Sequence, residues 1–285
     1  MSSKEFFDIF LFPANWDFQL NLVFIGVSII YLLLTGPYRR WFPNSEPVPG
    51  KTKVFFLLGM IVYYFALGSP IRVIAAELFS MHMMQMSLLY FVLPPLLWLG
   101  IPAYMIRPLL NIKVFRKIWN FFSKPLISLV VFNGSLSFYH LPVVFEAIMN
   151  SQVLHNVTHG FLLFAALTMW WPIISPVKEL DRLRPIPKLG LIFANGFILT
   201  PACAMITFTD IVLFDSYSQM SQLAPIMSPL HDQQFGGVIM KIMQEIVYIT
   251  AIILVYTRWV RSERKKEEEE LMKIRQENSS HLANA

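Results

Sequence analysis

The sequence has few charged residues and a single cysteine. Charged residues make up 14% of its 285 positions, whereas soluble domains carry about 25%. Because 55% of the residues are hydrophobic, this shortage of charge predicts a membrane protein. The lone cysteine, Cys203, excludes an intrachain disulfide.

Several motifs of well-known chemistries are also missing. The chain has no His-Glu-x-x-His segment, no Gly-x-Ser-x-Gly segment and no phosphate-binding loop, so a membrane zinc protease, a serine hydrolase and a nucleotide hydrolase have no support. A retinal protein needs a lysine deep in its last span, but Lys241 lies only a few residues inside the predicted edge. The clear repeated halves of many transporters are not found either.

Long apolar runs dominate what is present. A membrane-spanning helix needs about 20 mostly apolar residues, and we predict such helices at residues 18–35, 53–68, 79–100, 125–139, 153–174, 189–209 and 238–257. The fourth run is interrupted by Asn133, Gly134 and Ser135, small residues typical of close helix packing. The sequence therefore predicts an all-α integral membrane protein with seven transmembrane helices in residues 1–258. We expect residues 259–285 to form a charged cytoplasmic tail.

The basic residues predict how the chain crosses the membrane. The first, third and fifth connections and the tail hold every lysine and arginine except Lys4, Arg72 and Lys241. Arg182, for example, lies in the fifth connection. Since basic residues collect on the cytoplasmic side, we expect the N-terminus outside and the C-terminus in the cytoplasm.

Most histidines fall near the predicted outer face, namely His82, His140, His155, His159 and His231. His155 and His159 are four apart, so they share one helix face with a rise of about 6 Å, a spacing that lets two imidazoles bind one metal. Met83 and Met86 lie beside His82. Imidazole suits copper and thioether sulfur favours Cu(I), and both cost less near hydrocarbon than charged ligands.

Each of these residues also has an ordinary structural interpretation. A single histidine at a membrane interface is more often a packing or headgroup contact, and methionine fills irregular gaps in cores. Lys241 and Glu245 are four apart and pair with each other in this interpretation. Histidines on facing spans, such as His82 and His159, would also suit haem, so a haem-handling protein is a weaker alternative.

Four segments together resemble a known family. Residues 80–85 read Ser-Met-His-Met-Met-Gln, His140-Leu-Pro precedes His155-x-x-x-His159, Trp-Trp-Pro follows at 170–172, and Asp-Gln-Gln-x-Gly-Gly occupies 232–237. Their order within residues 16–258 is similar to that in the CtaG-type cytochrome c oxidase assembly factors of bacteria, which have seven helices. One departure is Met86, where many relatives place a second histidine.

The resemblance implies a factor needed to build a haem–copper oxidase at the stage of the copper centre. We expect a non-enzymatic, multi-pass protein of the bacterial cell membrane that binds Cu(I) near the outer face and helps to form CuB. A metal-free scaffold for an oxidase subunit is the alternative. The expected partners are the catalytic subunit of cytochrome c oxidase or other assembly factors, besides the lipid bilayer, and not nucleic acid.

The resemblance and the histidine pattern together give a predicted set of site residues. The predicted primary metal ligands are His82, His155 and His159, and the predicted auxiliary ligands are Met86, Met83 and His140. Residues of the outer loop before the last span are predicted to shape the access route or to contact the partner, namely His231, Asp232, Gln233 and Gln234.

Overall fold

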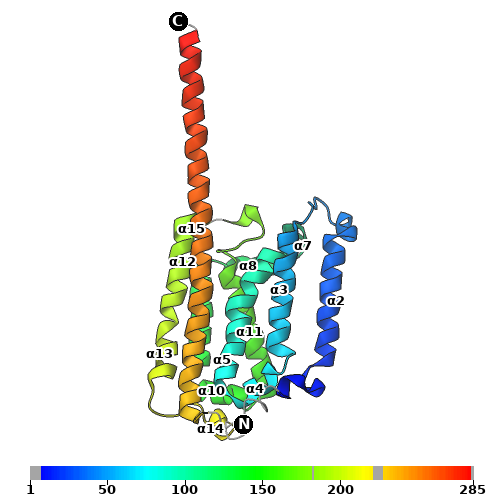
Figure 1. Cartoon of the computed structure of the whole chain (residues 1–285), viewed down its shortest axis with the longest axis vertical. Helices are drawn as coiled ribbons and strands as arrows, with labels where there is room; N and C mark the ends of the chain where they lie inside the picture. The colour runs from blue at the N-terminus through cyan, green and yellow to red at the C-terminus, as the bar shows by residue number, and fades with distance from the viewer. Residues whose placement is uncertain (1–7, 182, 221–226, 284–285) are drawn as a thin grey trace.

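Long helices run side by side along the axis of the molecule, and one of them extends far beyond the others (Figure 1). The computed structural model describes residues 8–181, 183–220 and 227–283. Within these ranges the regular elements are helices, without a strand, so the predicted all-α fold is confirmed. Lys4 and Arg182, which entered the orientation argument, lie outside the described ranges.

Helices occupy all seven predicted spans. Four spans are single helices, α2 (Phe18–Thr35), α3 (Gly50–Leu67), α9 (Pro125–Tyr139) and α11 (Gln152–Trp170). The third span joins α5 (Phe79–Ser87) through the π-helical turn η3 (Leu88–Val92) to α6 (Leu93–Gly100). The sixth joins α12 (Pro185–Ile198) to α13 (Thr200–Phe208), and the last is part of α15 (Pro229–Ala283).

Six of these segments are long and apolar enough to cross a membrane by themselves. The described residues supply a seventh when α8 (Lys113–Phe122) and α9, which meet at 76°, are counted as one broken span. The 15 residues of α9 extend only about 22 Å, short of the roughly 30 Å hydrocarbon core. The chain is therefore a multi-pass membrane protein with six or seven spans, and its orientation stays a prediction.

Short helices that the sequence did not predict connect the spans. α4 (Ile71–Glu77), α10 (Pro142–Met149) and α14 (Asp215–Met220) gather at one end of the bundle, whereas α7 (Ala103–Asn111) and α8 lie at the other (Figure 1). The remaining elements are the 3-10 turns η1 (Pro13–Asn15), η2 (Pro37–Trp41) and η4 (Lys178–Leu180). We call the end with α4, α10 and α14 the distal end, because it lies opposite the charged tail.

Two prolines disturb the third span near its middle. Pro94 and Pro95 have no backbone N–H, so the carbonyls of Tyr90 and Phe91 lose their ordinary helical donors. The turn just before these prolines is π-helical, a form that appears mostly as single turns inside helices. Tyr90 lies in this turn, and its side chain lines a cavity between helices.

The last helix begins earlier than predicted. The prediction that residues 231–237 form a loop is wrong, because α15 starts at Pro229 and these residues form its first turns. Gly236 and Gly237 allow this part of α15 to pack closely. A Cβ atom at Gly236 would lie 2.6 Å from the Phe79 ring, and one at Gly237 would overlap Thr207. The start of α15 is thus fitted against α5 and α13.

The same helix also continues into the predicted tail. α15 has 55 residues and no break at residue 258, so the charged segment continues the last helix. Its ion pairs there, such as Lys266 with Glu263 at 2.9 Å, are exposed and contribute little to stability.

Candidate functional site

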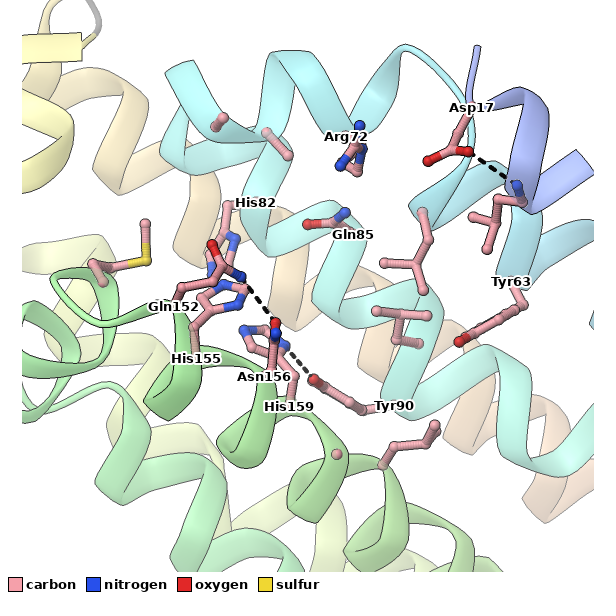
Figure 2. A pocket seen from close by; sticks show the side chains of 18 of the residues that line it. Asp17, Tyr63, Arg72, His82, Gln85, Tyr90, Gln152, His155, Asn156 and His159 are labelled. Carbon is pink, nitrogen blue, oxygen red and sulfur yellow. Dashed lines mark hydrogen bonds between the residues drawn. The ribbon is translucent and has the colours of Figure 1, made fainter. Parts of the chain in front are cut away.

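A cavity of about 650 Å³ opens between the third span, α11 and α4. Its polar lining comes from His82, Gln85, Tyr90, Gln152, His155, Asn156 and His159, together with Asp17, Tyr63, Arg72 and Tyr217. We call it the histidine cavity, and Figure 2 shows it from close by. Apolar side chains such as Leu20, Leu89 and Leu163 complete the wall.

The three predicted primary ligands meet in this cavity. The rings of His155 and His159 lie one helical turn apart on α11, with centroids separated by 4.2 Å. His82 reaches them from α5, and its ring centroid is 6.0 Å from that of His159. Figure 2 shows the three rings grouped on one side of the cavity. His82 is 73 and 77 positions from the other two histidines in the sequence, and the fold brings all three to one cavity. Their role as metal ligands stays a prediction.

Two tyrosine hydroxyls contact these imidazoles. The Tyr139 hydroxyl oxygen lies 2.9 Å from Nε2 of His82 and 3.4 Å from Nε2 of His159. The Tyr90 hydroxyl oxygen lies 2.6 Å from Nδ1 of His159. Nδ1 of His155 is buried and has no hydrogen-bond partner. Both ring nitrogens of His159 are therefore within hydrogen-bond distance of a tyrosine hydroxyl, whereas Nδ1 of His155 has no hydrogen bond.

The arrangement contains donors for a soft metal, but they are not gathered around a ready-made position. Among the residues that the structure describes, no three His, Cys, Asp or Glu side chains are placed to hold a metal ion. The donor chemistry still fits Cu(I), since three imidazoles face one largely apolar cavity. The buried, unpartnered Nδ1 of His155 is an atom that such a ligand would satisfy.

The three predicted auxiliary ligands do not line this cavity. Met83 and Met86 are fully buried in the hydrophobic core, where Met83 contacts the position of Gly236 on α15. His140 is buried at the end of α9, and its Nδ1 lies 2.7 Å from the carbonyl oxygen of Leu136. Their assignment as ligands stays a prediction, and their positions outside the cavity do not support it.

The Asp-Gln-Gln segment makes internal contacts. Asp232 and Gln233 are buried. The Asp232 carboxylate accepts hydrogen bonds from the backbone N–H groups of Phe79 at 2.7 Å and Ser80 at 3.2 Å. The Gln233 side chain accepts from the N–H of Leu213 at 2.7 Å. These two residues therefore join α15 to the start of α5 and to the chain before α14.

The other two residues of this group lie nearer the surface. The Gln234 side chain donates to the carbonyl of Thr209 at 2.9 Å, and His231 is exposed. The predicted role of all four residues in access or partner contact stays a prediction, and His231 is the one whose side chain is exposed for such a contact.

Sequence reasoning missed the tyrosines of the site. Tyr90 lies inside the third predicted span, Tyr139 ends the fourth and Tyr217 lies in the connection before the last span. Each reads as an ordinary aromatic residue, and no spacing signals that they lie beside histidines. Burial raises the pKa of Tyr217 well above its usual range, with added effects of Tyr139 and nearby carboxylates. Its hydroxyl therefore stays protonated and donates to the carbonyl of Ala75 at 2.9 Å.

Gln85 was within reach of sequence reasoning, because it ends the histidine-containing segment at residues 80–85. Its side-chain amide donates to the carbonyl of Ala66 at 2.7 Å and lines the cavity. It therefore ties α5 to α3 beside the histidines.

Comparison with known proteins gives the same family that the four sequence segments resemble. A family model described as cytochrome c oxidase caa3 assembly factor matches residues 29–262. Uncharacterized proteins of Mycobacterium bovis and Mycobacterium tuberculosis are each 25% identical in an alignment 239 residues long, which covers 78% of this chain and 36% of theirs. The chain thus spans about a third of the length of these curated relatives. No solved structure matches the chain.

Proposed function

Because this chain belongs to the cytochrome c oxidase caa3 assembly factor family, we propose that it carries Cu(I) in the histidine cavity for the forming oxidase. In this proposal the protein is not an enzyme. It holds copper as cargo and passes it to the CuB centre of the catalytic subunit. The observation that carries the proposal is the meeting of His82, His155 and His159 at one cavity.

The chemistry of the cavity supports this cargo. Neutral imidazoles bind copper well and carry no charge that would resist burial in an apolar wall. A delivered ion must also leave, and a site whose nitrogens have alternative hydrogen-bond partners releases its metal more readily than a closed cage. Nδ1 of His155 is a nitrogen that has no hydrogen bond to give up before it binds copper.

The expected depth of the site agrees with delivery to CuB. The positive-inside rule applied to the sequence puts the distal end outside the cell. Among the described residues that line the histidine cavity, Arg72 alone is a lysine or arginine. CuB of haem–copper oxidases is expected at a similar depth toward the outer face, with histidine ligands. Donor and acceptor would then meet without moving copper across the membrane.

The test is the copper content of the purified full-length chain. The wild type and the double variant His155→Ala/His159→Ala are loaded with Cu(I) under reducing conditions, and copper per protein is measured by mass spectrometry. We expect the wild type to retain copper and the double variant to lose at least 10-fold in affinity. His231→Ala is the matched control, because His231 is exposed on α15. Equal copper in the double variant and the wild type overturns the proposal.

A metal-free scaffold is the second candidate, and one observation favours it. No three ligand side chains are already placed around a metal position in the described parts of the chain. A scaffold would use the cavity to receive a segment of the oxidase subunit. Excess copper supplied to a deletion strain separates the two functions, because restored oxidase activity is expected only for copper delivery.

A further inference from the structure

The hydroxyl of Tyr139 lies where two ligand nitrogens converge. Its oxygen is 2.9 Å from Nε2 of His82 and 3.4 Å from Nε2 of His159. The three residues come from α5, α9 and α11, so the hydroxyl sits at a junction of three helices. Tyr139 is buried, with 1% of its surface exposed. A single oxygen therefore occupies the place from which a metal would contact both imidazoles.

His159 has no ring nitrogen with a lone pair that is free of a tyrosine hydroxyl. A neutral imidazole has one N–H donor and one acceptor lone pair. If the lone pair is on Nδ1, it accepts from the Tyr90 hydroxyl at 2.6 Å. If the lone pair is on Nε2, it accepts from the Tyr139 hydroxyl. In either tautomer a tyrosine O–H faces the only nitrogen of His159 that could bind a metal.

We propose that Tyr139 keeps the copper site closed, and that Cu(I) binds His82 and His159 only when the Tyr139 hydroxyl withdraws from between them. This inference rests on the proposed function and assigns a regulator to the same site. Tyr139 is a positioning residue, since its hydroxyl competes with the metal and is not itself a ligand. The Tyr139 hydroxyl has one proton, so of the two Nε2 atoms one accepts that proton and the other donates its N–H to the oxygen. When the hydroxyl withdraws, these hydrogen bonds break and the donating ring moves its proton from Nε2 to Nδ1. Both Nε2 lone pairs are then available to Cu(I), and the tyrosine proton stays on its oxygen.

The position of Tyr139 in the fold suits such a movement. It is the last residue of α9, and the chain turns at His140 before α10 starts at Pro142. Its ring packs against Phe145 of α10, with centroids 5.3 Å apart. A change in the α9–α10 turn would therefore draw the hydroxyl away from the histidines, and a docking oxidase subunit at the distal end would act on that turn.

The expected effect is a weaker and more exchangeable copper site than the histidines alone would make. A neutral hydrogen bond shifts an equilibrium by roughly 2- to 10-fold, and the Tyr139 hydroxyl makes two such contacts. Removing it should tighten Cu(I) binding about 10-fold and slow its release. Tyr139→Phe is the suitable variant, because it deletes the hydroxyl and keeps the buried ring.

The experiment titrates full-length protein in detergent with Cu(I) against a coloured Cu(I) chelator of known affinity. Tyr139→Phe should hold copper about 10-fold more tightly than the wild type and release it more slowly to added chelator. Tyr31→Phe is the matched control, since it also deletes a buried tyrosine hydroxyl, which bonds to the carbonyl of Gly100 at 2.7 Å, and Tyr31 does not line the histidine cavity. Its affinity should equal that of the wild type.

The outcomes separate this inference from the proposed function. If the wild type binds copper and Tyr139→Phe binds it equally or less tightly, the closure role is overturned and copper delivery stands. If neither protein binds copper, the proposed function fails and the closure role fails with it. If Tyr139→Phe binds copper and the wild type binds far less, the closure role is supported.

A measurement on the wild type covers the case in which Tyr139→Phe does not fold. In protein labelled with ¹⁵N-histidine, Cu(I) should shift the Nε2 resonances of two histidines together, as both lose contact with one hydroxyl. A shift confined to His155, with His82 and His159 unchanged at saturating Cu(I), overturns the inference.

Discussion

The Oδ2 atom of Asp232 lies 2.7 Å from the backbone nitrogen of Phe79, and this contact joins the start of α15 to the start of α5. The first N–H groups of a helix have no partner within the helix, and a carboxylate at this place satisfies them and complements the helix dipole. His82 follows Phe79 by three residues. The Asp-Gln-Gln segment therefore helps to fix where His82 enters the histidine cavity.

Loss of this carboxylate should destabilise the bundle. Asp232→Ala leaves the buried N–H groups of Phe79 and Ser80 without their acceptor, which costs about 1–3 kcal/mol. We expect a lower temperature of unfolding in detergent and weaker copper retention. Asp210→Ala is the control, because Asp210 is exposed. Equal unfolding temperatures for the two variants would contradict the capping role.

The close approach of α15 and α13 gives a second prediction. A methyl group at Gly237 would overlap Thr207 and crowd Ile206, so Gly237→Ala should force the helices apart at a cost of about 1–3 kcal/mol. Gly190→Ala on α12 is matched in chemistry, but nothing lies within 4 Å of its added Cβ. That control should be neutral or slightly stabilising. Thermal unfolding of both variants checks the difference, and a Gly237→Ala protein as stable as Gly190→Ala would show that the contact is loose.

Bound copper should stabilise the folded protein. A ligand present at 100 times its dissociation constant adds about 2.7 kcal/mol when it binds only the native state. We expect Cu(I) to raise the unfolding temperature of the wild type and a Cu(I) chelator to reverse the rise. His155→Ala/His159→Ala should show no rise. A rise of equal size in the double variant would place the copper elsewhere.

A buried polar contact between α9 and α12 gives a fourth prediction. Asn133 donates to the side-chain oxygen of Asn195 at 2.7 Å, and both residues are buried. Asn195→Ala leaves that donor with fewer partners, so we expect a loss of about 1–3 kcal/mol. Thr250→Ala on α15 removes an exposed hydroxyl bonded within its own helix and serves as the control. Unfolding temperatures that agree for both variants would argue against a structural role for the pair.

The spans were predictable because the hydrocarbon core of a membrane accepts only segments with mostly apolar side chains. A helix that crosses it must be apolar over its whole length, and that demand is visible in residues 18–35 and 79–100 without any knowledge of packing. The short helices were not predictable in this way. α4 and α14 lie at the distal end, where tertiary contacts such as Tyr217 to Ala75 decide the local conformation. The loop predicted at residues 231–237 failed for the same reason, because the paired glycines serve close helix packing there.

The histidine cavity was predictable in part. The spacing of His155 and His159 and the end of the bundle shared with His82 were readable from the sequence, and the cavity brings these three together. The contacts of Tyr90 and Tyr139 were not, since they join residues 69 and 57 positions apart. Such contacts depend on how each helix is rotated about its own axis relative to its neighbours, and the local sequence pattern does not predict that rotation. Met83 was misleading because neighbouring residues on a helix point in different directions.

The unbroken length of α15 ties events at one end of the molecule to the other. Its first turns hold the start of α5, and its last turns stand free of the bundle as a single rod (Figure 1). One continuous helix therefore joins the charged end of the chain to the residue that caps the helix carrying His82.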